Sequence, residues 1–257
     1  MVIGGCGGHQ AATNGDKDSF RHRHRPQGEG LNILQINLRY CHFGYVLLQQ
    51  FLQDQATDVI LVQDPPRAIL SGEGFFRGYE VILSTSFDPA NHEDRPLTAI
   101  LIRSSLPFRR LPSAHSRLCG ALISTRRGPV AFISAYIRHT DGDGLGALTH
   151  LVTDTRPQTP QMIIGADCNG HSSWWGPPDT AANAVGSLLE DFILHERFTI
   201  LNRWPCPATF HSDMGHQSWI DLSLSTAPLA SAVEDWRILA DVDFDSDHSP
   251  VPFSLRL

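Results

Sequence analysis

At 257 residues, the chain is long enough to form one large domain with a sizeable hydrophobic core. Its hydrophobic share of 41% and charged share of 18% are typical of a globular protein and exclude a disordered chain. The formal net charge of −7 argues against a module that coats nucleic acid through bulk electrostatics, but it suits a cluster of carboxylate metal ligands. No apolar run approaches the ~20 residues that a membrane-crossing helix needs, so no membrane association is predicted.

In chain order, the first segment is polar. Residues 1–30 are rich in Gly, His, Arg, Gln and Asp and have no hydrophobic period, so they are predicted to form a flexible leader. They also contain no apolar stretch that resembles a secretory signal. Residues 31–257 are predicted to form a single domain.

Short apolar runs typical of strands recur from Leu31 onward, separated by turn signals or helical patterns. The predicted strands are Leu31–Leu38, Val59–Gln63, Glu80–Ser84, Leu97–Arg103, Ala121–Thr125, Val130–Ile137, Gln161–Ala166, Ile200–Leu201, Trp219–Leu224 and Val251–Leu257. The predicted helices are Phe43–Gln55, with an apolar stripe that includes Val46, Leu145–Thr153 and Asn183–His195. Many strands, few helices and no internal repeat predict two packed β-sheets with helices on their outer faces.

The cysteines do not form a recognisable framework. Cys6, Cys41, Cys119, Cys168 and Cys206 are odd in number, scattered, and never in C-x-x-C spacing. This pattern predicts free thiols rather than disulfides or a zinc site.

Polar residues recur at or near the ends of the apolar runs. They are Asn37, Asp64, Tyr136, Asp167, Asn169, Asp221, Asp247 and His248. An aspartate after a strand, taken alone, is usually a turn former or a helix cap. Several such residues from separate strands, chemically suited to one reaction, favour an active site built on rigid strand ends.

These residue types fit hydrolysis of a phosphodiester. Mg²⁺ held by carboxylates and water neutralises the phosphate and stabilises the leaving oxygen. Asp64 and Asp247 are candidates to supply metal oxygens, and Asp167 is the candidate base for the attacking water. The expected hydrogen-bond donors are Asn37, Asn169 and His248. Asp221 is expected to raise the pKa of His248 and keep the imidazole protonated near neutral pH.

A series of short motifs follows in a characteristic order. They are QINL (Gln35–Leu38), VQDP (Val62–Pro65), SAYI (Ser134–Ile137), GADCNGH (Gly165–His171), ATF (Ala208–Phe210), SWIDLSL (Ser218–Leu224) and SDHSP (Ser246–Pro250). Together they resemble the endonuclease/exonuclease/phosphatase family, which includes deoxyribonuclease I-like and apurinic-site endonucleases. The resemblance extends from Leu31 to Leu257. The segment GADCNGHSSWWG is most similar to the endonuclease domains of non-LTR (LINE-type) retrotransposons of the site-specific arthropod group.

The resemblance implies both a fold and an activity. The implied α/β fold is a four-layered sandwich in which two mainly antiparallel β-sheets pack face to face and are flanked by helices, as in deoxyribonuclease I. The implied activity is a Mg²⁺-dependent DNA endonuclease, with Mn²⁺ as an alternative metal. It would nick one strand of a double-stranded DNA target and leave a 3′-hydroxyl for target-primed reverse transcription. A reverse transcriptase domain would then follow Leu257, and a nuclear location follows from this role alone.

Position by position, the resemblance implies roles for individual residues. The implied metal residues are Asn37, Asp64 and Asp247, and Asp167 and Asn169 are placed around the attacking water. The residues implied to face the phosphate are Tyr136, Thr209 and His248, with Asp221 as the partner of the histidine. The family has Glu where this chain has Asp64, whose side chain is one methylene shorter. We therefore expect weaker Mg²⁺ binding or a shift toward Mn²⁺ rather than an inactive enzyme.

Residues 210–219 (FHSDMGHQSW) are predicted to form a β-hairpin with Gly215 near its tip. By resemblance, this hairpin lies beside the active site and enters a DNA groove. The candidate DNA contacts are Arg138, Thr209, His211, His216, Gln217 and Ser218. An exposed loop without a role in DNA binding is the alternative.

Three other functions compete with this interpretation. An apurinic-site repair endonuclease has the same fold, and cleavage of abasic against intact duplex separates the two. A phosphatase or phospholipase is disfavoured because no membrane-facing apolar hairpin or basic lipid-binding cluster is present. A catalytically impaired DNA-binding module is suggested by Asp64 and disfavoured by the acidic net charge.

Overall fold

The structure is a computed structural model that describes residues 30–70, 76–84, 95–138 and 142–257. The predicted leader therefore lies outside the described residues, apart from Gly30, which begins the first strand.

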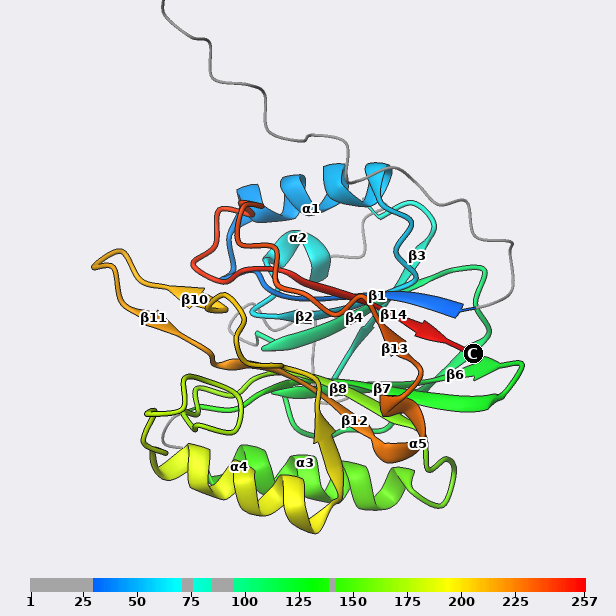
Figure 1. Ribbon diagram of the computed structural model, residues 1–257. Helices are drawn as coiled ribbons and strands as arrows, with labels where there is room; N and C mark the ends of the chain where they lie inside the picture. Colours follow the sequence, from blue (N-terminus) through cyan, green and yellow to red (C-terminus); the bar gives the residue numbers. More distant parts are fainter. Residues whose placement is uncertain (1–29, 71–75, 85–94, 139–141) are drawn as a thin grey trace, which may run out of the picture.

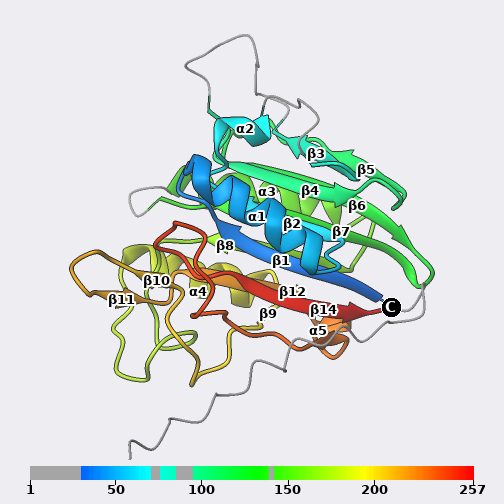
Figure 2. The same ribbon diagram turned by 90° about the horizontal axis from the view of Figure 1, so that it is seen from above.

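Two six-stranded sheets form the centre of the molecule (Figure 1). The first sheet consists, in spatial order, of β13 (Val233–Glu234), β14 (Val251–Arg256), β1 (Gly30–Asn37), β2 (Val59–Gln63), β4 (Thr98–Arg103) and β3 (Tyr79–Leu83). The second consists of β5 (Phe108–Leu111), β6 (Leu118–Thr125), β7 (Gly128–Tyr136), β8 (Met162–Asp167), β12 (Asp221–Thr226) and β9 (Phe198–Ile200). A separate hairpin, β10 (Phe210–His211) with β11 (Gln217–Ser218), projects beyond the sheets (Figures 1 and 2).

Helices cover the outer faces of both sheets. The first sheet carries α1 (His42–Asp54) and the short α2 (Arg67–Leu70), and Figure 2 shows α1 lying across this sheet. The second sheet carries α3 (Gly142–Thr155) and α4 (Ala184–His195), while the short α5 (Ala227–Ala230) follows β12. The four-layered α/β sandwich implied by the resemblance is confirmed.

Successive side chains of a strand point to opposite faces of its sheet, so the two sheets and their helices enclose three hydrophobic layers. In β2, Ile60 and Val62 pack with α1 in one core cluster, whereas Val59 and Leu61 pack in a second cluster between the two sheets. A third cluster lies between the second sheet and α3 and α4. The central strands are therefore buried on both faces, which explains why their sequences are almost continuously apolar.

Each sheet contains one parallel pair of strands, and the remaining pairs are antiparallel. In the first sheet β1 runs parallel to β2, and in the second β7 runs parallel to β8. Parallel neighbours end at the same edge, so Asn37 pairs with Gln63 and Tyr136 pairs with Asp167. Because β12 runs antiparallel to β8, it begins at this edge, with Asp221 opposite Asp167. This topology brings the candidate site residues Asn37, Tyr136, Asp167 and Asp221 to one edge of the two sheets.

Cys41, Cys119, Cys168 and Cys206 are free thiols, as predicted, whereas Cys6 lies outside the described ranges.

Among the helices of the described part of the chain, none is long and apolar enough to span a membrane.

Candidate active site

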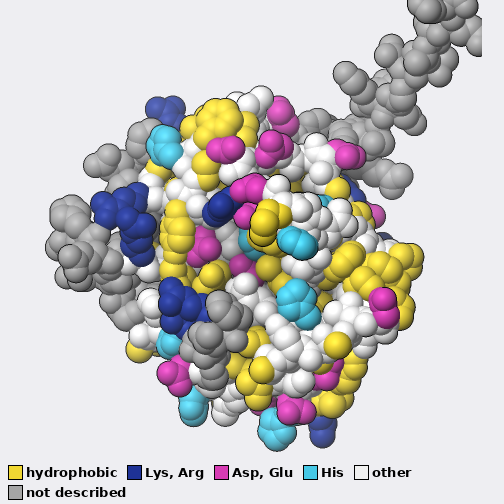
Figure 3. All heavy atoms as spheres, turned by 90° about the vertical axis from the view of Figure 1, so that its left-hand side faces the viewer, with side chains coloured by type: hydrophobic (Ala, Val, Ile, Leu, Met, Phe, Trp, Pro, Cys, Tyr) yellow, Lys and Arg dark blue, Asp and Glu magenta, His cyan; other side chains and the backbone are white. Residues whose placement is uncertain are grey.

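The candidate site lies at the edge where β1, β2, β7 and β8 end and β12 begins. Figure 3 looks onto this edge, where acidic side chains lie in a hollow bordered by basic and histidine side chains. The strand ends from both sheets therefore meet, as the sequence predicted from separate apolar runs.

Asn37 links carboxylates that come from the two sheets. Its Nδ2 donates to Oδ2 of Asp167 at 2.8 Å and to Oδ2 of Asp64 at 3.3 Å. Its Oδ1 accepts the backbone N–H of Arg39 at 2.7 Å. Asn37 was predicted as a hydrogen-bond donor and, by resemblance, as a metal ligand. The hydrogen bonds of Nδ2 agree with the first role.

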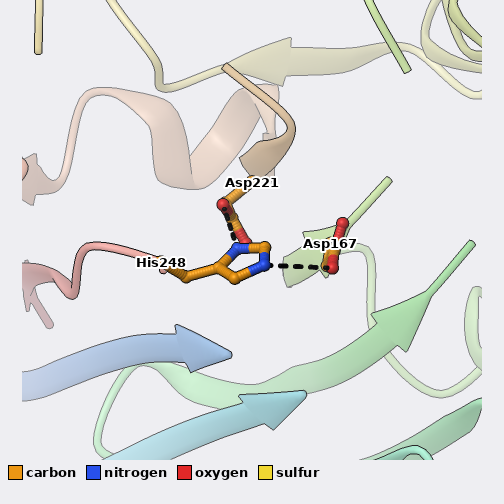
Figure 4. A group of neighbouring side chains, drawn as sticks. All are labelled: Asp167, Asp221 and His248. Atoms are coloured by element: carbon orange, nitrogen blue, oxygen red, sulfur yellow. Dashed lines mark hydrogen bonds and ion pairs between the residues drawn. The ribbon is translucent and has the colours of Figure 1, made fainter. Parts of the chain in front are cut away.

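His248 lies between two buried aspartates (Figure 4). Its Nδ1 is 2.9 Å from Oδ2 of Asp221, and its Nε2 is 3.9 Å from Oδ2 of Asp167. The loop that carries it is fixed to β1, because the Ser246 hydroxyl donates to the backbone oxygen of Asn37 at 2.8 Å. The predicted pairing of Asp221 with His248 is therefore present in the structure.

The surroundings raise the pKa values of both His248 and Asp167. Burial alone lowers the pKa of His248, but the charge and hydrogen bond of Asp221, together with the charges of Asp167 and Asp247, raise it to about 9. Burial, followed by the charge of Asp221, raises the pKa of Asp167 to about 7. The imidazole is therefore cationic at neutral pH, and the Asp167 carboxyl can accept a proton in the same pH range.

Asn169 and Tyr136 complete the polar surface around Asp167. Asn169 has a positive φ of 49°, which turns its side chain back so that Nδ2 donates to Oδ1 of Asp167 at 3.2 Å and to the Ile137 carbonyl at 3.1 Å. Asn169 also lies close enough to Tyr136 to lower the pKa of its phenol. Burial, then the negative charges of Asp64 and Asp167, raise the pKa of Tyr136 to about 12. Its phenol therefore stays protonated and able to donate a hydrogen bond.

Asp64 has a partner that the sequence analysis missed. It follows β2 with a positive φ of 44°, its carboxylate accepts a hydrogen bond from Asn37, and the Tyr40 side chain is close enough to influence its pKa. Burial raises the pKa of Asp64, although Tyr40 and Asn37 act against the rise. Tyr40 also has a positive φ, of 56°, in the turn after β1. No strand pattern marks such a turn residue, so only the folded turn reveals it.

Two carboxylates offer oxygens suited to a divalent metal. Oδ1 of Asp64 and Oδ1 of Asp247 are buried and have no hydrogen-bond partner among the described residues. Oδ2 of Asp247 is 3.2 Å from Nη1 of Arg39. Mg²⁺ and Mn²⁺ favour such hard oxygen ligands, so Asp64 and Asp247 fit the metal that the fold family implies.

A second carboxylate group is less suited to a metal. Ligand atoms of Asp167, Asp221 and His248 lie within 4.8 Å of one another. However, Oδ2 of Asp221 is hydrogen-bonded to the imidazole, and Oδ2 of Asp167 accepts from Asn37. A cationic His248 at the centre of this trio would also repel a metal ion. This trio therefore suits a divalent metal less well than the unpartnered oxygens of Asp64 and Asp247 do.

Thr209 is placed differently from the prediction. Its side chain is fully buried, at 0% exposure, and its hydroxyl accepts the backbone N–H groups of Ile220 and Asp221, each at 3.1 Å. It therefore holds the start of β12 and cannot contact DNA from this position. Its predicted role as a phosphate contact is corrected to one of supporting Asp221.

The hairpin is attached directly to the loop that carries Asp247 and His248. Phe210 forms a β-bridge with His248, and the two rings pack edge to face with centroids 5.0 Å apart. The His211 N–H donates to the Asp247 carbonyl at 2.8 Å. Of the other predicted DNA contacts, His216, Gln217 and Arg138 are exposed, and Ser218 is half-buried. The base of the hairpin and the loop that carries His248 are therefore held together, while the tip of the hairpin is exposed.

Comparisons with known proteins agree with this architecture. Residues 130–252 match a family model described as endonuclease-reverse transcriptase. No curated protein matches the chain in sequence. Similar solved structures include the endonuclease domain of TRAS1, a telomere-specific non-LTR retrotransposon, with a TM-score of 0.73 and 24% identity over 89% of this chain and 99% of that one.

Two other similar structures come from different kinds of protein. The AP endonuclease LMAP from Leishmania major has a TM-score of 0.66 and 16% identity, over 89% of this chain and 88% of that one. The mannosyl-6-phosphatase Bt3783 from Bacteroides thetaiotaomicron has a TM-score of 0.62 and 15% identity, over 88% of this chain and 100% of that one. At these identities the likeness concerns the fold. The predicted resemblance is confirmed: in fold the chain resembles the endonuclease/exonuclease/phosphatase family, and residues 130–252 match the endonuclease-reverse transcriptase model.

Proposed function

We propose that the chain is a metal-dependent DNA endonuclease that nicks one strand of a duplex and leaves a 3′-hydroxyl. The observation that carries this proposal is the position of His248 between Asp221, at 2.9 Å, and Asp167, at 3.9 Å. A cationic imidazole beside a carboxyl that can accept a proton is the combination that hydrolysis of an anionic phosphodiester requires.

Each side chain has a distinct task in this proposal. Asp167 accepts the proton of the attacking water, and Asn37 and Asn169 hold its carboxylate in place through the hydrogen bonds described above. His248 donates a hydrogen bond to a phosphoryl oxygen through Nε2, while Asp221 holds its Nδ1. The protonated phenol of Tyr136 supplies a second donor beside the phosphate.

The metal has a separate place in the site. Asp64 and Asp247 would hold Mg²⁺ or Mn²⁺, which would neutralise the phosphate and stabilise the leaving oxygen. Asn37 orients the Asp64 carboxylate for this role through its hydrogen bond, and Tyr40 lies beside the carboxylate.

Double-stranded DNA is the substrate that best fits the surroundings of the site. The projecting hairpin presents His211, His216 and Gln217, whose side chains can hydrogen-bond base edges or phosphates in a groove. Arg138 is exposed and close enough to influence the pKa values of Asp64 and Tyr136, so it is placed to contact a phosphate. The match to an endonuclease-reverse transcriptase family supports target-primed reverse transcription, with a reverse transcriptase as partner. A nuclear place of action is part of the proposal and follows from this role alone.

Nicking of supercoiled plasmid tests the proposal. Wild type is assayed with Mg²⁺, with Mn²⁺ and with EDTA, next to His248→Ala. We expect nicking with either metal, its loss in EDTA, and at least a ~100-fold slower rate in His248→Ala, as when other preorganised donors are removed. A polymerase should extend the nicked strand directly, because the product carries a 3′-hydroxyl.

Two results would contradict the proposal. A wild-type protein that binds duplex but nicks it with neither metal would support the binding-module alternative. Cleavage restricted to duplexes with an abasic site would instead identify an apurinic-site endonuclease, a function of the similar Leishmania major protein.

A further inference from the structure

The layer between the two sheets changes from apolar to polar along the strands toward the candidate site. Far from the site it is apolar and contains Ile33, Leu61, Phe132 and Ile163. At the site it ends in the catalytic side chains. Between these two zones lie buried polar residues, four of which form hydrogen bonds across the sheets, namely Gln35, Gln63, Ser134 and Ser223, none more than 1% exposed. We call these four residues the inter-sheet clamp.

One half of the clamp joins β1 to the second sheet. Nε2 of Gln35 donates to the backbone oxygen of Ala166 at 3.2 Å, and the Ser223 hydroxyl donates to Oε1 of Gln35 at 2.8 Å. Ala166 directly precedes Asp167, and Ser223 lies on the same face of β12 as Asp221. Gln35 lies on the same face of β1 as Asn37. These hydrogen bonds therefore connect the three strand segments that carry Asn37, Asp167 and Asp221.

The other half joins β2 to the second sheet. Nε2 of Gln63 donates to the Ser134 hydroxyl at 2.9 Å and to the Gly165 carbonyl at 3.1 Å. The Ser134 hydroxyl donates in turn to the Val62 carbonyl at 2.9 Å. Gln63 directly precedes Asp64, so this half fixes the end of β2 against β7 and β8.

The close packing at Gly165 shows that the clamp fills its space tightly. A Cβ added at Gly165 would lie 2.7 Å from Cδ1 of Leu61 and 3.0 Å from Oε1 of Gln35. Only glycine therefore lets the Gln35 side chain reach across to Ala166 and Ser223. An apolar layer fixes the separation of two sheets without fixing their register, because apolar contacts are not directional, whereas hydrogen bonds are.

We propose that the inter-sheet clamp, Gln35, Gln63, Ser134 and Ser223, positions the catalytic groups of the two sheets relative to one another. The clamp residues touch neither the phosphate nor the metal, so they are positioning residues. The proposal rests on the proposed phosphodiester hydrolysis. It states that the rate of the chemical step depends on these buried hydrogen bonds, because catalytic groups from separate sheets must stay within a fraction of an ångström of their working geometry.

The strand β12 supplies a matched pair of variants. Ser223 and Ser225 are both fully buried, and they pair with Gly165 and Ile163 of β8 in the same register. The Ser223 hydroxyl bonds to Gln35, whereas the Ser225 hydroxyl has no partner among the described residues. Ser223→Ala and Ser225→Ala therefore remove the same atom from the same face of one strand, and only the first breaks the clamp. Ser134→Ala breaks the other half independently.

The experiment measures single-turnover cleavage over a range of enzyme concentrations. Two substrates are used, supercoiled plasmid and the small phosphodiester bis(p-nitrophenyl) phosphate. We expect the maximal rate to fall about tenfold or more in Ser223→Ala and in Ser134→Ala, with the half-saturating concentration unchanged. Ser225→Ala should keep the wild-type rate. Thermal unfolding of all variants shows whether they are folded at the assay temperature.

The outcomes separate this proposal from the proposed function. Equal rates in folded Ser223→Ala and Ser225→Ala would overturn the clamp, as would a loss confined to the half-saturating concentration. If wild type cleaves the small phosphodiester but not the plasmid, the DNA function fails while the comparison of variants still decides the clamp. Wild type that cleaves neither substrate would overturn both.

Discussion

Nδ1 of His248 lies 2.9 Å from Oδ2 of Asp221, and this contact joins the two sheets of the sandwich. Asp221 begins β12 of the second sheet, whereas His248 lies in the loop before β14 of the first. Both side chains are buried, so the ion pair is poorly screened by solvent and each charge strongly affects the other. The pair therefore sets the protonation state of the site as well as its geometry.

Removal of the Asp221 charge should shift the pH dependence of nicking to lower pH. In wild type the rate should rise as Asp167 loses its proton near pH 7, and fall as His248 loses its proton near pH 9. The negative charge of Asp221 raises both pKa values. In Asp221→Asn both the rising and the falling limb of the pH–rate profile should therefore move to lower pH. The measurement is the maximal nicking rate of both proteins across the pH range.

The asparagine keeps the shape and the hydrogen-bond acceptor of the aspartate, so the variant isolates the charge. A uniformly lower rate with both limbs unmoved would mean that Asp221 acts through geometry alone. Asp245→Asn changes an exposed carboxylate in the same loop as His248 and serves as the control.

Thr209 should contribute to stability through its buried hydroxyl. Thr209→Val keeps the volume but removes the acceptor for the N–H groups of Ile220 and Asp221. A buried donor left unsatisfied costs about 1–3 kcal/mol, so we expect the free energy of unfolding to fall by about 2 kcal/mol. Thr209→Ser keeps the hydroxyl and should lose less. Urea unfolding measures both, and equal stability of the two variants would contradict this role.

Much of the fold could be predicted from the sequence because strands buried on both faces leave a strong signal. The runs Val59–Gln63 and Val130–Ile137 coincide closely with β2 and β7, and the polar residues after them do meet at one edge. Short strands such as β5, in which the consecutive residues Arg109 and Arg110 are both exposed, were missed because they bury few side chains. The hydrophobic pattern reports burial, so elements with little burial remain hidden.

The details of the site depended on contacts that no local pattern encodes. Thr209 lies in a motif typical of the family, yet its hydroxyl is turned inward toward Asp221 by the start of β12. Tyr40 reaches Asp64 only because two successive residues after β1, Arg39 and Tyr40, adopt positive φ. Even in α1 the predicted stripe was partly wrong: Val46 is 42% exposed. Side-chain direction in turns and at helix edges is set by tertiary packing.

Metal binding should depend on the Asp64 carboxylate. Asp64→Asn keeps the hydrogen-bonding shape but removes the charge beside the buried, unpartnered Oδ1. Because affinity for hard cations rises with the number of charged oxygen ligands, we expect the Kd for Mn²⁺ to rise by at least about tenfold. Asp64→Glu keeps the charge on a side chain that is one methylene longer, so this variant should bind Mn²⁺ at least as tightly as wild type. Titration calorimetry with Mn²⁺ measures both affinities.

The control for metal binding is Asp179→Asn, at an exposed carboxylate. Its Kd for Mn²⁺ should equal that of wild type. An unchanged Kd in Asp64→Asn would remove Asp64 from the metal site and would leave it only its hydrogen bond with Asn37.

The hairpin tip should determine where the enzyme cuts, without determining whether it cuts. Met214 at the tip is 82% exposed, whereas the base of the hairpin is fixed by the β-bridge between Phe210 and His248. Exchange of residues 212–216, with Gly215 kept for its φ of +80°, therefore changes the groove contacts and spares the site. We expect new nick positions on a defined duplex, mapped by sequencing, with plasmid nicking close to the wild-type rate. Substitution of exposed Arg126 and Arg127, at the far end of β6, is the control and should change neither; unchanged positions after the exchange would place target choice outside the hairpin.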